Sequence, residues 1–273
     1  MAIRDVVSAD GTTIVYQVSG KADARPLVLL HGWSANLRCW GAAADDFATR
    51  FRVIAIDLRG HGYSDAPAAG YDDPKNWAAD VEAVLTAEGI TSGALLLGWS
   101  YGGIVLSDYL TACGTGAVAG VVYTGSMANI GPHMPGAATG SLMQAAIPGV
   151  FAESAGHAVR AFSVFGNANT GPGPDKGPDA QRLFGVSLAT APSVRKALFY
   201  RSVDNTDMLR ALDIPVLVLH GTADRVVPVE NGRYIADIAP NAHASFWEGA
   251  QHGLFIEDRS RFVAEVSAFA ERL

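Results

Sequence analysis

A shortage of cysteine and of charge sets the first limits on what this chain can be. Its 273 residues include two cysteines, Cys39 and Cys113, whose spacing matches neither a metal site nor a disulfide framework. Charged residues make up only 17%, and the formal net charge of -7 provides no basic surface for nucleic acid or membranes. No apolar run approaches the roughly 20 residues of a membrane span, and residues 1–5 lack the apolar core of a secretory signal. We therefore expect a cytoplasmic protein with reduced cysteines and with neither nucleic acid nor a membrane as partner.

Hydrophobic residues are plentiful, and their pattern alternates between two kinds of segment. They form 49% of the chain, enough for a substantial core, and the length suits one large α/β domain or two small ones. Residues 3–7 and 13–18 predict a hairpin through an Asp-Gly turn. Further along, continuously apolar strands alternate with helices, which is typical of a mostly parallel sheet covered on both faces. The expected strands are residues 27–30, 53–56, 95–97, 118–123, 215–219 and 244–247, and the expected helices are 36–49, 74–88, 104–110, 229–238 and 260–273.

This alternation stops at residue 125 and resumes at residue 213. Between them we expect short helices at residues 141–146, 154–165, 180–189, 193–200 and 206–212, and a loop over the Gly- and Pro-rich residues 171–178. The pattern predicts a core domain made of residues 1–125 and 213–273, with residues 126–212 forming a helical cap. Such a cap would lie over the C-terminal ends of the strands, where open α/β sheets bind ligands.

One short motif carries a reactive side chain. Residues 98–102 read Gly-Trp-Ser-Tyr-Gly and stand between an apolar strand and the start of a helix. A nucleophile elbow needs this arrangement, because the serine must project from a strained turn between strand and helix. The two glycines lack a Cβ and let strand and helix approach closely. We therefore predict that Ser100 is a nucleophile and that the Tyr101 N–H, at the helix N-terminus, faces a developing oxyanion.

A serine hydroxyl needs a general base, and the chain has seven histidines that could act as one. We expect His252 to be this base, because it follows the last strand in a loop and completes the order serine, acid, histidine. The other histidines belong to turns, to the cap or to the approach of the last strand: His31, His61, His133, His157, His220 and His243.

The acid that orients the histidine is expected at Asp224. It lies in the turn that follows the strand at residues 215–219, although turn aspartates also serve as simple caps. Four other aspartates are poorer candidates because they precede this strand or lie on a helix: Asp204, Asp207, Asp213 and Asp237.

The loop after the first parallel strand reads His-Gly-Trp-Ser and is expected to supply the second oxyanion donor. The Trp33 N–H is our candidate, and the Ser34 N–H is the alternative. The Trp33 side chain either lines the pocket or packs in the core. Met127 and Phe162 of the cap are expected substrate-binding residues. The turn at residues 57–65 combines charges with a histidine but has no nucleophile, so we interpret it as structural.

Together these motifs resemble the α/β-hydrolase superfamily from end to end. The residues that carry the resemblance are His31-Gly32-Trp33, the turn Asp57–Ser64, the elbow Gly98–Gly102, the Asp224 turn and His252. The resemblance implies a mostly parallel eight-stranded sheet flanked by helices, with a helical cap inserted after the sixth strand. A finer similarity is to serine esterases that cleave pimeloyl-carrier-protein methyl ester and to cofactor-free haloperoxidases and perhydrolases. Haloalkane dehalogenases and epoxide hydrolases share the fold but carry aspartate where this chain has Ser100.

The expected activity is hydrolysis of small carboxylic esters with apolar or aromatic groups through an acyl-enzyme, with neither a metal nor an organic cofactor. Two alternatives use the same triad: a perhydrolase or haloperoxidase, and a C–C bond hydrolase. A third, from another class, is a ligand receptor of the same fold with a vestigial triad. The natural ester and the oligomeric state stay open at this point, because fold and triad serve many reactions.

Overall fold

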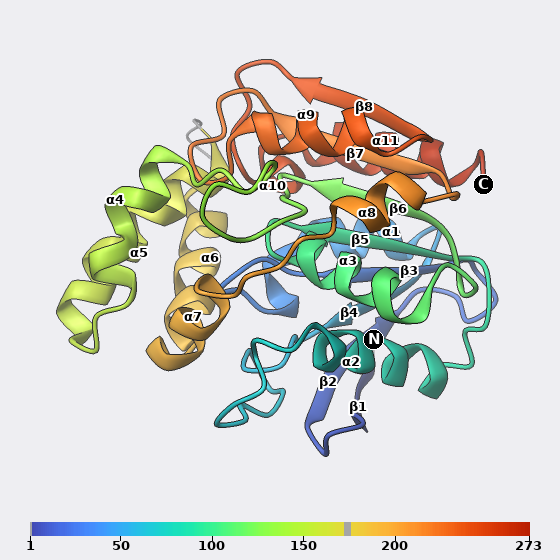
Figure 1. Cartoon of the computed structure of the whole chain (residues 1–273), viewed down its shortest axis with the longest axis horizontal. Helices are drawn as coiled ribbons and strands as arrows, with labels where there is room; N and C mark the ends of the chain where they lie inside the picture. Colours follow the sequence, from blue (N-terminus) through green and yellow to red (C-terminus); the bar gives the residue numbers. More distant parts are fainter. Residues whose placement is uncertain (1, 172–175) are drawn as a thin grey trace.

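Eight strands form a sheet through the middle of the molecule, in the spatial order β1-β2-β4-β3-β5-β6-β7-β8 (Figure 1). The protein is described here by a computed structural model that covers residues 2–171 and 176–273. From β3 to β8 the neighbouring strands are parallel, while β2 pairs antiparallel with both β1 and β4. The expected mostly parallel, eight-stranded sheet is therefore confirmed. The strands are β1 Ala2–Val7, β2 Thr13–Ser19, β3 Pro26–Leu30, β4 Arg52–Ile56, β5 Ala94–Trp99, β6 Val118–Thr124, β7 Val216–Gly221 and β8 Ala242–Trp247.

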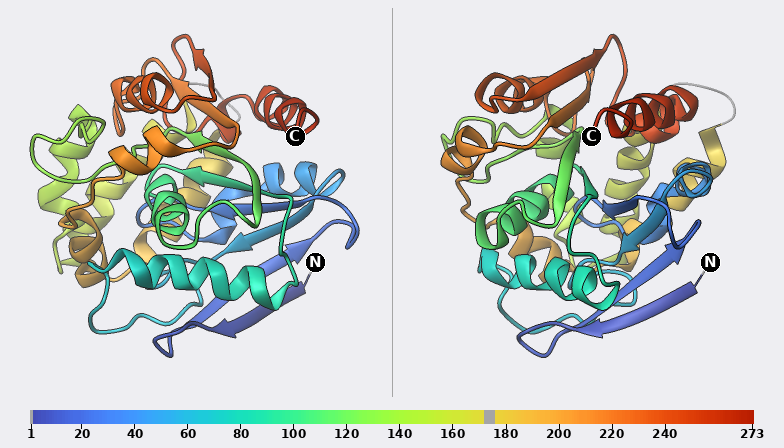
Figure 2. Two further views of the ribbon diagram at one scale, coloured as in Figure 1. Left: turned by 45° about the vertical axis from the view of Figure 1, so that its right-hand side comes forward. Right: turned by 90° about the vertical axis from the view of Figure 1, so that its right-hand side faces the viewer.

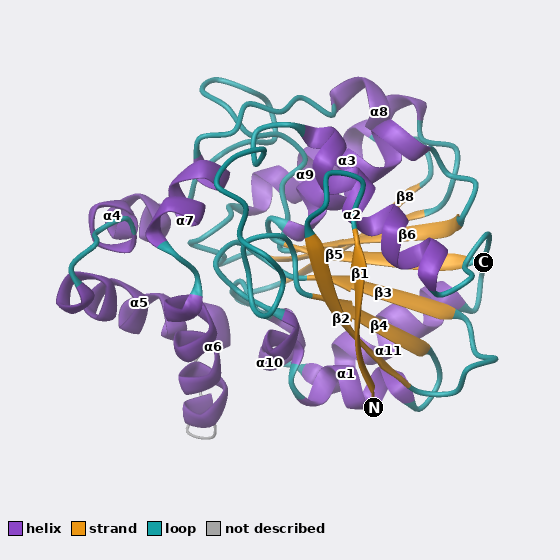
Figure 3. Cartoon of the chain, turned by 90° about the horizontal axis from the view of Figure 1, so that it is seen from below, coloured by secondary structure: helices purple, strands orange, loops and turns teal. Residues whose placement is uncertain are grey.

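The two faces of the sheet are covered by different helices, which Figure 3 shows on opposite sides of the strands. In β3, Val28 and Leu30 point into one core layer and Leu27 and Leu29 into the other, as the period-two geometry of a strand requires. Both layers are apolar, which explains why the central strands are continuously hydrophobic. The first layer is covered by α2 Pro74–Ala87, α3 Gly102–Cys113 and α9 Val229–Ile238, and the second by α1 Ala42–Ala48, α10 Leu254–Glu257 and α11 Arg259–Ala270. In the described part of the chain, no helix has the length and apolarity needed to cross a bilayer.

The segment between β6 and β7 forms helices, as expected. Four of them stand beyond the sheet in Figures 1 and 3: α4 Ser141–Val150, α5 Ala155–Thr170, α6 Gly177–Ala189 and α7 Pro192–Phe199. They share a core cluster with Val226 and Val227, which follow β7. An antiparallel bridge between Ile130 and Val203 joins the two ends of this segment. The last helix, α8 Thr206–Ala211, packs against α3 and α9 and so belongs to the layer that covers the sheet.

Three local expectations differ from the structure. The helix expected over residues 36–49 is divided into a 3-10 turn, Leu37–Trp40, and α1, because Gly41 adopts a positive φ of 50° between them. The short helix α10 was not expected, since its four residues are too few to show a period. The expected loop at residues 171–178 falls partly on 172–175, outside the described residues, and α6 already begins at Gly177.

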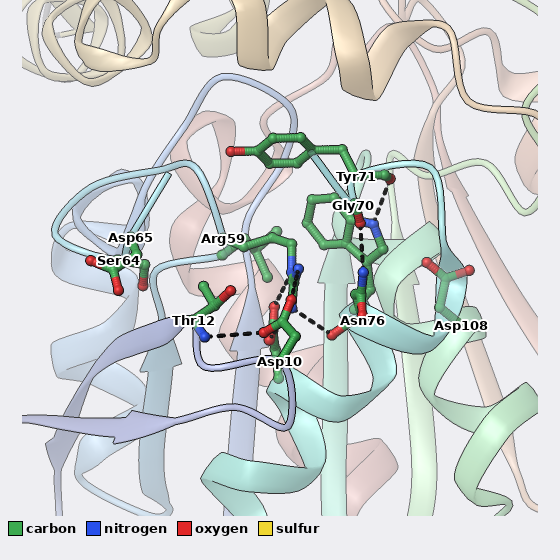
Figure 4. Close-up of polar contacts among 12 residues, drawn as sticks. Asp10, Thr12, Arg59, Ser64, Asp65, Gly70, Tyr71, Asn76 and Asp108 are labelled. Carbon is green, nitrogen blue, oxygen red and sulfur yellow. Dashed lines mark hydrogen bonds and ion pairs between the residues drawn. The ribbon is translucent and has the colours of Figure 1, made fainter. Parts of the chain in front are cut away.

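A buried arginine joins three segments at the β1–β2 edge of the sheet, the edge opposite β7 and β8 in Figure 2. The Arg59 side chain is fully buried and donates to both carboxylate oxygens of Asp80 in α2 at 2.7 Å. It also donates to Asp10 at 2.8 Å, in the hairpin turn, and to the Asn76 carbonyl at 3.1 Å (Figure 4). The turn at residues 57–65, expected to be structural, thus provides the central cation of an ion-pair network.

Replacing this arginine should cost much stability. In Arg59→Met, Asp80 stays buried without its partner, and we expect the free energy of unfolding to fall by about 3–5 kcal/mol. Urea denaturation measures the change. Arg50→Met is the matched control, because the Arg50–Glu271 pair is exposed and should contribute about 1 kcal/mol or less. Equal losses in the two variants would contradict a dominant role for the buried network.

Candidate active site

Ser100 sits on a strained turn between β5 and α3. Its φ is +55°, a left-handed conformation that is uncommon for any residue other than glycine. The glycines around it allow this turn to form. A Cβ on Gly98 would lie 2.6 Å from the Gly102 carbonyl, and a Cβ on Gly102 would overlap the Leu30 carbonyl at the end of β3. The Gly-x-Ser-x-Gly pattern therefore folds into the tight strand-to-helix bend that the sequence predicted.

Two backbone N–H groups near Ser100 have no hydrogen-bond acceptor among the described residues. Neither the Trp33 nor the Tyr101 amide donates to another group of the chain within the described residues. Trp33 follows Gly32, and a Cβ on Gly32 would lie only 3.0 Å from the Ser100 Cβ, so this loop runs directly beside the serine. Of the two donors considered for this loop, Trp33 borders the cavity described below and Ser34 does not. The Ser34 hydroxyl instead donates to the Ser187 carbonyl at 2.8 Å.

His252 and Asp224 form a direct pair. The His252 Nδ1 lies 2.7 Å from Asp224 Oδ2, and both side chains are buried. Because the carboxylate can only accept, Nδ1 carries the proton and Nε2 has a lone pair available to accept one. Asp224 Oδ1 accepts from the Val226 and Val227 amides at 2.8 and 2.9 Å. The aspartate thus acts as a turn cap and as the partner of the histidine at the same time.

Asp224 is held in its charged form. Burial alone would raise the pKa of this carboxyl, but the adjacent His252 and His220 outweigh burial and hold the pKa well below its usual range. His220 lies 3.3 Å from the carboxylate, and its Nε2–H donates to the Val227 carbonyl at 2.8 Å. The carboxylate therefore accepts three hydrogen bonds, from the Val226 and Val227 amides and from His252, and His220 lies beside it as a fourth polar neighbour.

The histidines of the two early turns are structural, as the sequence suggested. The His31 Nε2 accepts from the Leu58 amide at 3.1 Å, and its Nδ1 donates to the Gly32 carbonyl at 2.8 Å. Burial lowers the pKa of His31 far below its ordinary value and that of His61 to about 4, so both rings are neutral at pH 7. The rings meet edge to face at 5.0 Å and join the two loops.

Ser100 and His252 border the same cavity, which measures about 430 Å³ and is lined by residues at the ends of the strands and by residues of helices α4–α7. Trp33 and Met127, two of the expected substrate-binding residues, line it. Apolar side chains form much of the remaining wall: Ile130, Met143, Phe165, Leu183, Leu198, Phe199, Val226 and Val227. Within residues 2–171 and 176–273, no group of three or more His, Cys, Asp or Glu side chains is arranged to hold a metal ion.

Phe162, the third expected substrate-binding residue, does not line this cavity. Its ring packs against Trp33 with the centroids 6.2 Å apart, and the Arg195 guanidinium lies over the Phe162 ring, 4.5 Å from its centroid. Phe162 and Phe165 are three residues apart and lie near each other on α5, but only Phe165 reaches the cavity wall. Both residues are phenylalanines, so the sequence alone could not tell which of them lines the cavity.

Sequence reasoning also missed contacts made by two residues of the cavity wall. Trp99, to which the sequence analysis gave no catalytic role of its own, donates its indole N–H to the His252 carbonyl at 3.1 Å. Asn169 in α5 borders the cavity, and its Nδ2 donates to the Phe165 carbonyl at 2.9 Å. The position of Trp99 directly before the serine was the one available signal, whereas Asn169 falls in a segment without any motif.

Comparisons with known proteins agree on one family. Residues 27–266 match the model described as "Alpha/beta hydrolase family". The chain is 32% identical to a non-heme chloroperoxidase from Streptomyces lividans, over 91% of this chain and 92% of that protein. It is 30% identical to a pimeloyl-[acyl-carrier protein] methyl ester esterase from Sodalis glossinidius, over 95% and 98%. Among solved structures, the esterase RhEst1 from Rhodococcus sp. ECU1013 has a TM-score of 0.98 and 55% identity, with 99% of each chain covered.

The close approach at Gly102 gives a stability prediction. In Gly102→Ala the new methyl group meets the Leu30 backbone, which cannot rotate away, so the free energy of unfolding should fall by about 2–3 kcal/mol or more. Gly185→Ala in α6 is the control. Nothing lies within 4 Å of its added Cβ, and this helical position should gain roughly 0.5–1 kcal/mol. A Gly102→Ala protein as stable as wild type, in thermal or urea unfolding, would mean that the elbow is loosely packed.

Proposed function

The chain belongs to the alpha/beta hydrolase family, and we propose that it is a serine carboxylesterase for small esters with apolar or aromatic groups. One observation carries the proposal: Ser100 and His252 border one cavity, and Asp224 is hydrogen-bonded to His252 Nδ1, which leaves the other ring nitrogen, Nε2, for proton transfer. The 55% identity to the solved esterase supports ester cleavage over other reactions of the fold.

In the proposed reaction, the Ser100 hydroxyl attacks the ester carbonyl while His252 Nε2 accepts its proton. Asp224 keeps Nδ1 protonated and stabilises the imidazolium that forms. The free amides of Trp33 and Tyr101 donate to the oxyanion, where charge develops. The alcohol leaves with the proton from His252 and an acyl-enzyme remains. A water molecule, deprotonated by His252, then releases the acid and restores Ser100.

The proposed substrate class follows from the division of the chain. We propose that residues 1–125 and 213–273 act as the catalytic core and that, within residues 126–212, helices α4–α7 act as a cap that selects the substrate, while α8 covers the sheet. The catalytic groups come from the core, while Met143, Phe165 and Leu183 of the cap provide apolar wall. Removing apolar groups of the substrate from water in this cavity favours binding by about 25 cal/mol per Å².

A second candidate, perhydrolysis, is favoured by the similarity to the non-heme chloroperoxidase. The same acyl-enzyme would form, and hydrogen peroxide would attack it in place of water, giving a peroxy acid and free Ser100. Measuring peroxy acid formation from acetate and hydrogen peroxide, against hydrolysis of simple esters, separates the two.

The cytoplasmic location and the absence of nucleic-acid or membrane partners, both expected from composition, stay predictions.

Ser100→Ala should abolish ester turnover and leave the fold intact, because it removes the nucleophile and little volume. The rate should fall on the order of a millionfold, the scale known for the serine of another hydrolase. The assay is turnover of p-nitrophenyl esters together with labelling by a fluorophosphonate probe, which should modify wild type at Ser100 and leave the variant unlabelled. Turnover by a clean Ser100→Ala preparation would assign the nucleophile elsewhere. A wild-type protein that is labelled but does not turn over esters would support the receptor alternative.

Cap residues on the cavity wall should set the preferred acyl length. In wild type we expect kcat/KM to rise with acyl length by up to about fourfold per buried methylene. Phe165→Ala enlarges the cavity and should shift the optimum to longer chains, whereas Val164→Ala, at an exposed position on the same helix, should not. Kinetics over a series from acetate to decanoate esters measures both. The same optimum in all three proteins would mean that the core walls the acyl site.

A further inference from the structure

Trp99 is the residue directly before Ser100 and ends strand β5. Its side chain and that of Tyr101 enter opposite core layers, so Trp99 lies on the side of the sheet covered by α1, α10 and α11. The indole ring is buried between three groups. Its centroid lies 5.2 Å from that of the His252 ring and 5.0 Å from that of the Phe255 ring, and a Cβ on Gly32 would lie 3.2 Å from the Trp99 Cε3 atom. One side chain thus contacts the histidine loop and the proposed oxyanion loop.

The contact with the histidine loop is also a hydrogen bond. Trp99 Nε1–H donates to the His252 carbonyl at 3.1 Å, and the bond is buried. The other backbone group of His252, its N–H, reaches only the Ala168 carbonyl, at 3.5 Å, the upper limit for such a bond. The indole therefore makes the shorter of the two backbone hydrogen bonds at His252.

We propose that Trp99 is a positioning residue that sets the distance and direction between Ser100 and His252. Asp224 fixes the ring of His252 at Nδ1, but a ring held at one atom can still shift with its backbone. The hydrogen bond from the Trp99 indole holds the His252 backbone in place. Because Trp99 directly precedes Ser100 in the chain, this bond ties the histidine loop to the turn that carries the serine. Nucleophile and base are thereby parts of one rigid unit, which proton transfer over a single hydrogen bond requires.

The chain offers a matched control in Trp40. It is buried in the same aromatic cluster, with its ring centroid 6.3 Å from that of Trp99 and 4.9 Å from that of Phe255. Its indole Nε1 has no hydrogen-bond partner within the described residues. Trp40→Phe and Trp99→Phe therefore remove the same atoms from the same cluster, but only Trp99→Phe removes a bond to the histidine loop.

The inference rests on the proposed esterase function, and the experiment separates the two. We would measure kcat and KM for a p-nitrophenyl ester, the rate of inactivation by a fluorophosphonate, and the thermal midpoint. Trp99→Phe should lower kcat and the inactivation rate by about tenfold or more, the scale of a small misplacement of reacting groups, with KM changed less than about twofold. Trp40→Phe should keep both rates close to wild type and should lose less stability than Trp99→Phe, because it breaks no hydrogen bond.

Equal rate losses in the two variants would overturn the inference, because they would reflect lost packing rather than the hydrogen bond. To guard against misfolding of Trp99→Phe, position 99 can carry 3-benzothienylalanine, which keeps the fused rings and replaces the N–H by sulfur. A tenfold loss of kcat in this protein supports the inference, and unchanged kcat overturns it. A wild-type protein without ester turnover would refute the proposed function instead, independently of either variant.

Discussion

The packing of the start of α3 against the end of β3 is the constraint on which the site depends. At Gly102 the helix backbone comes so close to the Leu30 carbonyl that no side chain fits between them. This approach bends the chain at Ser100 into its positive φ and brings the Gly32 loop within contact of the serine Cβ. Strands β3 and β5 are hydrogen-bonded neighbours, with Leu30 paired to Gly98, so both loops start from fixed points. The proposed nucleophile and oxyanion donors are therefore positioned by two hydrogen-bonded strands at the centre of the sheet.

Features that depend on short segments could be predicted from the sequence. The elbow, the hairpin and the parallel strands were each recognised from patterns within about ten residues. Asp224 and His252, 28 residues apart in the chain, were chosen because each follows a strand, and adjacent parallel strands bring such loops together. The Trp99–His252 bond joins residues 153 apart, and no local pattern encodes it. The split of the helix at Gly41 was missed because apolar spacing continues across the break, and only the backbone conformation shows it.

A buried cation, Arg195, joins three helices of the segment between β6 and β7 to the loop that follows β3. The Arg195 guanidinium is paired with carbonyls, of Val150 at 3.0 Å and of Ser187 and Leu188 at 3.0 and 3.2 Å, so it joins α4, α6 and α7. Burial lowers the pKa of Arg195 to about 10, which still leaves it charged at pH 7. Its own carbonyl accepts the Trp33 indole N–H at 3.0 Å. Arg195 is thus hydrogen-bonded both to the helices that would select substrate and to the loop that would bind the oxyanion. A movement of these helices would therefore displace the loop.

Two histidines flank the Asp224 carboxylate, and their surroundings determine which can act as a base. His220 uses its Nε2–H for the Val227 carbonyl and turns its Nδ1 toward Gly232, away from the cavity. Its ring can therefore only support the carboxylate. His252 presents Nδ1 to Asp224 and borders the cavity with Ser100, so its Nε2 is the nitrogen left for proton transfer. One carboxylate with two imidazole neighbours would consequently serve one base, the proposed His252, and one structural support, His220. The difference arises from the place of each histidine in the sheet: His220 lies within β7, whereas His252 lies in the loop that follows β8.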